Sequence, residues 1–194
     1  MKKQNEFNFC PICRSDNISY LDNRKWKCAE CGYTLYNNVA CAVGIILYDD
    51  EDNILLEVRA KQPRKGFLAL PGGFCDQDET AEHAVIRECQ EETGFTPKQA
   101  TYLCSFPNNY EYKGVLYKTC DLFFTAKLGS NDKNETDQTA SIEKLIKSLH
   151  NQKSEVSSFV ACKVKSQSDV DSLPLAFESA KKTLSLWLKR KSNQ

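Results

Sequence analysis

The feature that most constrains this chain is a segment near its middle in which glutamates recur at helical spacing. Glu88, Glu91 and Glu92 lie three and four positions apart within an amphipathic pattern. Residues at these spacings share one face of an α-helix, so their carboxylates should project together. Thr80 is a suitable N-cap for this helix, and Gly94 is a suitable residue to end it. We therefore expect a helix of about three turns with one acidic face.

Three carboxylates on one rigid face form a hard-oxygen site. They repel one another unless a cation lies among them. Mg²⁺ and Mn²⁺ bind such oxygens and keep positions open for water and phosphate. The sequence therefore predicts a divalent cation held by Glu88, Glu91 and Glu92, suited to diphosphate chemistry. Two alternatives to a catalytic metal site remain. The glutamates could form a solvated acidic surface, or the chain could keep the fold of an enzyme without its activity.

The wider pattern, Gly-x5-Glu-x7-Arg-Glu-x2-Glu-Glu-x-Gly, begins at Gly73 and resembles the box of the Nudix hydrolases. The resemblance implies that Arg87 pairs with Glu79 and orients the other glutamates. Gly73 belongs to a Leu-Pro-Gly-Gly-Phe turn, where the backbone must approach a ligand or metal closely. Cys89 stands where the family usually has a branched aliphatic residue, but cysteine is apolar and small enough to pack there. The family also places a further acid beyond the box, and Glu155 is the best candidate for it.

Two Cys-x2-Cys pairs form the second motif, and fourteen residues separate them. This spacing predicts a tetrahedral four-thiolate zinc site, which is structural because it leaves no open position. So short a segment needs the metal for its folding energy. Disulfides or unrelated thiols are the alternatives. The expected zinc ligands are Cys10, Cys13, Cys28 and Cys31.

Length and composition are those of one globular domain with a small module, in a reducing compartment. The 194 residues include ten cysteines and begin with a polar stretch that lacks a signal-peptide pattern, which predicts a reducing, cytoplasmic location. The 26 basic and 26 acidic residues balance, so no overall field attracts nucleic acid or membrane. The longest apolar run is too short to span a bilayer. The other six cysteines are expected mainly to pack in the core.

Hydrophobic periodicity predicts an α/β fold: an α/β/α sandwich with a mixed sheet, preceded by the small zinc ribbon. We expect the ribbon over residues 1–37 and the Nudix domain over residues 38–194. Residues 129–154 look like an insertion with a short helix, whose apolar stripe would pack or contact a partner. A helix over 175–191 should close the chain. The expected strands cover residues 39–47, 54–59, 101–106, 115–128 and 159–164, with a loop at 107–114.

The combination of ribbon and box resembles the NADH pyrophosphatase branch of the Nudix hydrolases. That branch has Ser-Gln-Pro-Trp-Pro-Phe-Pro downstream of the box, and this chain has only Ser105-Phe106-Pro107. The resemblance therefore implies metal-dependent hydrolysis of a nucleoside diphosphate linked to another group, of the NAD(H) or ADP-ribose type. Substrate contacts are expected from a cation on the second strand and two tyrosines near the third, namely Arg59, Tyr110 and Tyr112.

A different class of function also fits the ribbon. Arg24, Lys25 and Lys27 form a small basic patch, so the chain could be a recognition module for nucleic acid or protein, including RNA with an NAD cap. Balanced charge weakens this alternative, and a solvated surface explains the patch equally well. The resemblance to ribbon-bearing Nudix enzymes also implies a possible homodimer.

Overall fold

The computed structural model describes residues 7–113, 115–128, 141–149 and 155–193, which form two compact units. One unit comprises the chain up to Ala40 together with Asn109–Lys118. The other comprises Cys41–Asn108 together with the chain from Thr119 onward. The division into domains at residues 37 and 38 stays a prediction, and most of the expected insertion at 129–154 lies outside the described residues.

The smaller unit holds a three-stranded antiparallel sheet in the order β1-β2-β3. The turn between its first two strands has positive φ at Asp22 and Asn23, 55° and 52°. Two consecutive residues of this kind match the right-handed twist of a hairpin. Trp26 is buried, with the rings of Phe7 and Tyr20 each 4.6 Å from its own. The strands are β1 (Ile18–Leu21), β2 (Lys25–Cys28) and β3 (Thr34–Tyr36).

The larger sheet has the order β6-β5-β4-β8-β7, and β9 pairs with β5. The pairs β5–β6 and β5–β9 are antiparallel. The amide of Leu128 donates to the carbonyl oxygen of Tyr48 at 2.8 Å, so the C-terminal ends of β4 and β8 meet and these strands run in parallel. The sheet is therefore mixed. Its strands are β4 (Ala40–Tyr48), β5 (Asn53–Arg59), β6 (Leu68–Ala69), β7 (Thr101–Tyr112), β8 (Val115–Lys127) and β9 (Val156–Lys163).

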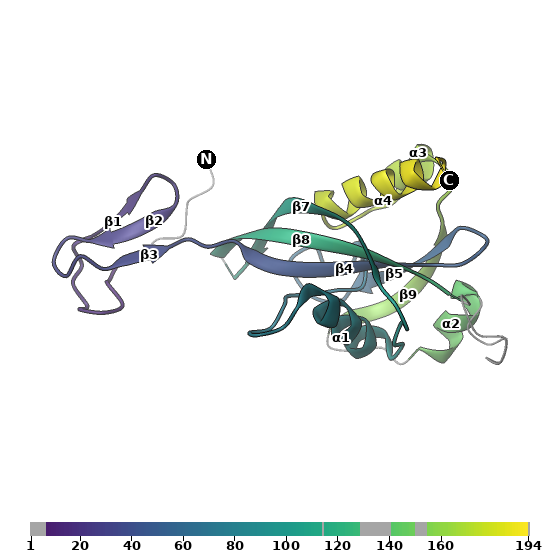
Figure 1. Cartoon of the computed structure of the whole chain (residues 1–194), viewed down its shortest axis with the longest axis horizontal. Helices are drawn as coiled ribbons and strands as arrows, with labels where there is room; N and C mark the ends of the chain where they lie inside the picture. Colours follow the sequence, from purple (N-terminus) through teal and green to yellow (C-terminus); the bar gives the residue numbers. More distant parts are fainter. Residues whose placement is uncertain (1–6, 114, 129–140, 150–154, 194) are drawn as a thin grey trace. The chain divides into compact units, whose positions relative to one another are not determined.

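Helices cover both faces of this sheet, with α1 and α2 on one side and α3 and α4 on the other (Figure 1). The strands supply both cores because alternate side chains point to opposite faces. Along β4, Ile45 and Leu47 pack with α1, and Ile46 packs with α4. The expected α/β/α sandwich is confirmed. The helices are α1 (Ala81–Thr93), α2 (Ile142–Ser148), α3 (Gln167–Ser172) and α4 (Glu178–Lys191).

Helix α1 has the predicted boundaries, for the predicted reasons. The Thr80 hydroxyl accepts a hydrogen bond from the backbone N–H of His83 at 3.3 Å, which satisfies one free amide of the first turn. Gly94 ends the helix in the left-handed conformation at φ 76°, and its amide donates to the carbonyl of Gln90. Ala84, Val85 and Cys89 are buried against the sheet, so Cys89 packs as expected. Glu92 is buried as well, whereas Glu91 is exposed.

Three predicted boundaries are wrong, and one of them is the start of β9, which lies at Val156 and not at residue 159. Strand β7 continues to Tyr112 instead of ending at a loop after residue 106. It is the last strand in the sheet order, so Pro107 can stand on it without removing a needed hydrogen bond. Helix α4 starts at Glu178, not at 175, because Leu175 forms a parallel bridge to Leu68 and is held in an extended conformation.

Buried Asp49 fastens the turn after β4 to the short helix α2. Its carboxylate accepts hydrogen bonds from the amides of Glu51, Asn53 and Ile142 at 3.0, 3.0 and 3.1 Å, and from the Asn53 side chain. Ile142 begins α2, so Asp49 caps that helix from a distant part of the chain. Ile142 and Leu145 are buried in the core, which confirms packing as the role of this stripe.

Replacing Asp49 with asparagine should destabilise the larger unit at neutral pH. Burial alone would raise the pKa of Asp49, but the hydrogen bonds from Asn53, Ile142 and Glu51 outweigh it and lower the pKa. A depressed folded pKa stabilises the fold above about pH 4, and this contribution is lost as the pH falls through the folded value. We expect a loss of about 2 kcal/mol at pH 7.

Urea unfolding of the wild type and of Asp49→Asn at neutral and acidic pH measures this effect. Asp50→Asn is the matched control, since Asp50 lies in the same turn and is exposed. The gap between wild type and Asp49→Asn should narrow in acid. A gap that stays constant with pH would mean that the charge of Asp49 contributes nothing.

Candidate metal centre and active site

Arg87 organises the acidic face of α1. Its Nε and Nη2 atoms donate to the two carboxylate oxygens of Glu79, both at 2.9 Å. Its Nη1 atom donates to Glu88 at 2.8 Å and to Glu91 at 3.3 Å. One guanidinium thus hydrogen-bonds to three carboxylates, with a bidentate bond to Glu79, and forms a longer ion pair with Asp76 at 3.7 Å. The pairing of Arg87 with Glu79 is present as the resemblance implied.

The contacts of Glu79 also fasten the loop before the helix. The amide of Asp76 donates to Glu79 at 3.0 Å, and Nη2 of Arg87 donates to the carbonyl oxygen of Phe74 at 3.0 Å. The hydrogen bonds from Arg87 lower the pKa of Glu79 to about 2, so this carboxylate stays ionised at physiological pH. Glu79 therefore acts here as the ionised partner that holds Arg87 over the helix.

The turn before the helix lies directly against the glutamates. The amide of Gly72 donates to Glu92 at 2.7 Å. A Cβ on Gly73 would lie 2.6 Å from the carboxyl group of Glu88. The amide of Val43 donates to the carbonyl of Gly73 at 2.8 Å, which ties the turn to β4. A side chain at position 73 would therefore collide with Glu88. The expected close approach of this backbone to a ligand or metal stays a prediction.

Two of the glutamates are withdrawn from water. Glu92 is only 6% exposed, and burial raises its pKa well above the ordinary value. The Glu88 side chain is 14% exposed, and burial raises its pKa as well. The Glu91 side chain is 48% exposed and is the most accessible of the three. The cluster therefore runs from a buried end at Glu92 to an open end at Glu91.

Sequence reasoning missed a fourth carboxylate, Glu57 on β5. It is 3% exposed and interacts directly with Glu92. Burial raises its pKa, and the charge on Arg59 opposes that rise. The signal in the sequence was a glutamate inside the otherwise apolar run from Ile54 to Val58, where only hydrophobic residues are expected.

The donor set fits a hard divalent cation. Carboxylate oxygens are the ligands that Mg²⁺ and Mn²⁺ prefer. One oxygen of Glu57 is buried and has no hydrogen-bond partner among the described residues, which is the environment that a cation would satisfy. Within the described part of the chain, however, these carboxylates do not converge within 4.8 Å as the cysteines do. One oxygen each of Glu88 and Glu91 is bonded to Arg87 in this arrangement, and the other oxygen of each is not.

Glu155 immediately precedes β9, and its carbonyl oxygen accepts a hydrogen bond from the amide of Ala60. Its exposed carboxylate pairs with Lys61 at 3.1 Å. Its negative charge contributes to the raised pKa values of Glu57 and Glu88, so it lies near enough to act on both. A role for Glu155 as base or as an extra ligand stays a prediction.

The three expected substrate residues are not all in the same compact unit. Arg59 lies two positions after Glu57, donates from Nε to the carbonyl of Pro63 at 2.9 Å, and holds its guanidinium 5.1 Å from the Phe177 ring centre. Tyr110 belongs to the other compact unit. The side chain of Tyr112 lies outside the described atoms. All three substrate contacts stay predictions.

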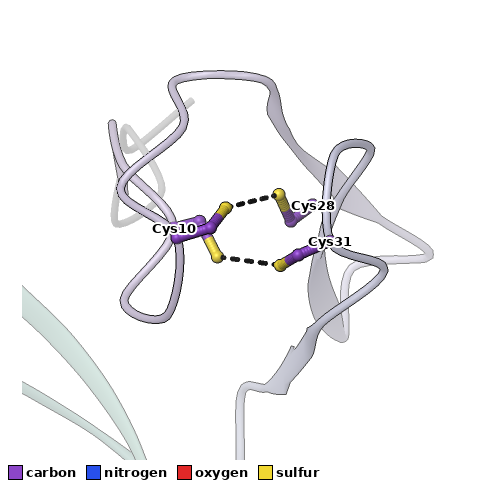
Figure 2. A group of neighbouring side chains, drawn as sticks. Cys10, Cys28 and Cys31 are labelled. Atoms are coloured by element: carbon purple, nitrogen blue, oxygen red, sulfur yellow. Dashed lines mark hydrogen bonds between the residues drawn. The ribbon is translucent and has the colours of Figure 1, made fainter.

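The four expected zinc ligands come together in the smaller unit. Their sulfurs all lie within 4.8 Å of one another, with Cys10 to Cys31 at 3.7 Å and Cys13 to Cys28 at 3.6 Å. Figure 2 shows the sulfurs of the two loops pointing toward one another. Four thiolates about 2.3 Å from a tetrahedral zinc ion would be spaced about 3.8 Å apart. The geometry is consistent with a zinc ribbon.

Both cysteine pairs are followed by a turn residue in the same conformation. Arg14 after the first pair has φ 63°, and Gly32 after the second has φ 72°. The backbone N–H of Cys13 lowers the pKa of Cys10 to about 7, which favours its thiolate. Against the backbone N–H of Ser15, the neighbouring sulfurs raise the pKa of Cys13 to about 12. The two loops are thus built alike around the same point.

The remaining cysteines do not all lie in the core. Cys89 and Cys104 are buried, but Cys41 and Cys120 are exposed, which corrects the expectation that each would pack inside. Cys41 is the second residue of β4, and Cys120 lies within β8. Burial raises the pKa of Cys75 to about 12, so this thiol beside the turn is not a ready nucleophile.

Gly73→Ala should lower activity without unfolding the protein. The new Cβ would meet the mobile carboxyl end of Glu88, which can move aside but would leave its working position. We expect a loss of activity of about 10- to 100-fold with a melting temperature lowered by no more than about 4 °C.

Gly72→Ala is the matched comparison for Gly73→Ala. There the Cβ would lie 2.1 Å from the carbonyl oxygen of Val43, and φ is 149°, so the backbone itself must move. That variant should lose about 3 kcal/mol or more of stability. Enzyme assays and thermal unfolding measure both variants, and a fully active Gly73→Ala would exclude the steric argument.

The comparison with protein families agrees with this geometry. The profile of the NUDIX domain matches residues 40–158, more than half of the chain. The chain belongs to the Nudix family.

Curated relatives share part of the sequence. An ADP-ribose pyrophosphatase of Methanocaldococcus jannaschii is 49% identical over 71 residues, which are 37% of this chain and 41% of that protein. The NAD-capped RNA hydrolase NudC of Photobacterium profundum is 33% identical over 108 residues, 53% of this chain and 39% of that protein. The chain thus spans well under two thirds of the length of these relatives.

Solved structures support the fold. A Nudix hydrolase from Nitrosomonas europaea superposes with a TM-score of 0.59 at 20% identity, covering 96% of this chain and 93% of that one. The Nudix domain of NrtR from Shewanella oneidensis, solved with ADP-ribose, gives 0.56 at 23% identity over 81% of this chain and 90% of that one. Among the described helices, none has the length and apolar character needed to cross a membrane.

Proposed function

We propose that this protein is a pyrophosphohydrolase that cleaves the diphosphate of a nucleoside diphosphate linked to a second group. The observation that carries the proposal is the acidic face of α1, where Arg87 gathers Glu79, Glu88 and Glu91 beside the Gly72–Gly73 turn. Membership of the Nudix family supports the same reaction class.

Each part of the site has a distinct task. Glu88, Glu91 and Glu92 would hold Mg²⁺ or Mn²⁺. When bound, such a cation neutralises the diphosphate and lowers the pKa of the attacking water. Arg87 and Glu79 keep the carboxylates on one side of the helix before the metal arrives. The glycine turn leaves room for substrate oxygens close to the backbone.

ADP-ribose is the first substrate to test, with NADH second. An ADP-ribose pyrophosphatase is 49% identical to this chain over a stretch that covers 37% of it, which supports ADP-ribose as a substrate. The downstream sequence lacks most of the motif expected for the NADH pyrophosphatase branch. Both substrates present the same adenosine diphosphate portion and would release AMP.

The test is to incubate the full chain with each compound and Mg²⁺ or Mn²⁺, and to separate the products by chromatography. We expect AMP with ribose 5-phosphate from ADP-ribose, or AMP with reduced nicotinamide mononucleotide from NADH. Running the reaction in ¹⁸O-labelled water shows which phosphorus is attacked. A folded, metal-loaded protein that releases AMP from no such compound would contradict the proposal.

RNA with an NAD cap is a second candidate substrate, supported by the similarity to NudC proteins. It contains the same diphosphate as NAD. Competition between capped RNA and free NADH separates the two possibilities, since a preference for RNA requires contacts beyond the dinucleotide. Salt-sensitive binding that falls on substitution of Lys25 and Lys27 together would indicate such contacts.

We also propose that the four-cysteine site binds one structural zinc ion. The matched sulfur spacing and the paired turn geometry support it. Four thiolates leave no position for substrate, so this metal would stabilise the ribbon and take no part in hydrolysis.

A further inference from the structure

Glu57 occupies a position in β5 where the strand calls for an apolar side chain. Ile54, Leu55 and Leu56 are fully buried just before it. Strand side chains alternate, so Glu57 faces the same side as Leu55, the side covered by α1. Pairing with β6 and β9 on either side encloses the residue. The fold therefore holds this carboxyl group beneath the acidic helix face.

One oxygen of that carboxyl group is unsatisfied. Oε2 of Glu57 is buried and has no hydrogen-bond partner in the part of the chain that the structure describes. An unpaired buried polar atom costs about 1–3 kcal/mol, and more when it is charged. Simple core packing would not retain such a group, because leucine would fill the space without this cost.

The charges around Glu57 are mostly negative. Glu92 touches it, and the carboxylates of Glu88 and Glu155 act on it from α1 and from the position just before β9. Arg59 is the opposing charge, and its Nε is already bonded to the carbonyl of Pro63. A buried group of carboxylates with an unsatisfied oxygen is the arrangement that a divalent cation completes.

We propose that Glu57 is a ligand of the divalent cation at the buried end of the site, where it binds the ion together with Glu92. This inference rests on the proposed function, because it assumes that the same centre takes Mg²⁺ or Mn²⁺. It extends the ligand set from α1 to the central sheet. The cation would then be fixed between two elements that are both rigid parts of the core.

The competing role for Glu57 is that of a neutral hydrogen-bond donor that positions Glu92 without touching the metal. Glutamine distinguishes the two roles. Its amide can donate to Glu92 as a protonated carboxyl group does, but it cannot supply an anionic oxygen to the ion. Leucine removes both capacities and matches the apolar pattern of the strand.

The experiment measures Mn²⁺ binding to the resting protein by electron paramagnetic resonance, without substrate. Wild type, Glu57→Gln and Glu57→Leu are compared, with Glu51→Gln as a control that removes one exposed charge near β5. Thermal unfolding of the metal-free proteins shows whether each variant is folded. Since leucine suits the site, Glu57→Leu should be at least as stable as wild type and keeps the test valid if glutamine is poorly tolerated.

We expect both Glu57 variants to bind Mn²⁺ about tenfold or more weakly, and Glu51→Gln to bind like wild type. Adding Glu92→Gln to Glu57→Leu should lower the affinity by less than the two single effects combined, since both side chains serve one ion. A folded Glu57→Gln or Glu57→Leu that loses less than about tenfold in affinity would overturn the proposal.

The outcome is separable from that of the proposed function. If Mn²⁺ binding depends on Glu57 but no nucleoside diphosphate is cleaved, the ligand assignment stands and the reaction fails. If AMP is released but the Mn²⁺ affinity does not depend on Glu57, the proposed reaction stands and the ligand assignment fails.

Discussion

Glu91→Gln is expected to lower turnover by about 100- to 1,000-fold while the protein stays folded. Glu91 is the most accessible of the three glutamates on the acidic face. Among the described residues, its carboxylate is bonded to Arg87 at 3.3 Å. Losing that half-exposed pair should cost little stability. Losing an anionic oxygen at the metal would remove charge stabilisation from the step in which negative charge builds on the diphosphate.

Glu82→Gln is the control for this substitution. Glu82 is an exposed acid in the first turn of the same helix, so Glu82→Gln removes the same charge from the same helix as Glu91→Gln does. The measurement is steady-state release of AMP at saturating Mg²⁺, followed by a titration with Mn²⁺. Activity of Glu91→Gln within a few fold of wild type would remove Glu91 from the catalytic group. A loss that added metal restores would place its role in metal affinity.

The sequence alone could predict the parts of this site that are local. The boundaries of α1 follow from Thr80 and Gly94, and the contact of Arg87 with Glu91 follows from helical i,i+4 spacing. The pairing of Arg87 with Glu79 was implied by the resemblance to the Nudix box. The same holds for the two cysteine loops, because each pair places its sulfurs through its own turn. In these cases the residues that interact lie within about two turns of one another or share a recognised spacing.

The parts that could not be predicted depend on distant pairings. Glu57 becomes meaningful only when β5 is placed beneath α1, which brings it to Glu92. Asp49 caps a helix that begins 93 residues later. The full length of β7 likewise depends on its place at the end of the sheet order, where Pro107 is tolerated. None of these relations has a periodic signal in the sequence.

Cys28→Ser is expected to abolish zinc binding and to unfold the ribbon, while the larger unit keeps its structure. The ribbon has a small core centred on Trp26, so a structural zinc site would supply most of its folding free energy, about 10–16 kcal/mol in isolated modules. The larger unit has two hydrophobic clusters of its own and should persist. Zinc content and amide hydrogen exchange measure the two effects separately.

Cys120→Ser controls for the loss of a thiol, since Cys120 is exposed and lies outside the cluster. It should keep one zinc ion per chain and full protection of β1–β3. Cys28→Ser should lose both, and its α1 amides should stay as protected as in wild type. Chelators alone cannot make this distinction because they remove Mg²⁺ or Mn²⁺ as well. If Cys28→Ser keeps its zinc and its protection, the four sulfurs are not a structural metal site, and the ribbon must be held by its aromatic core.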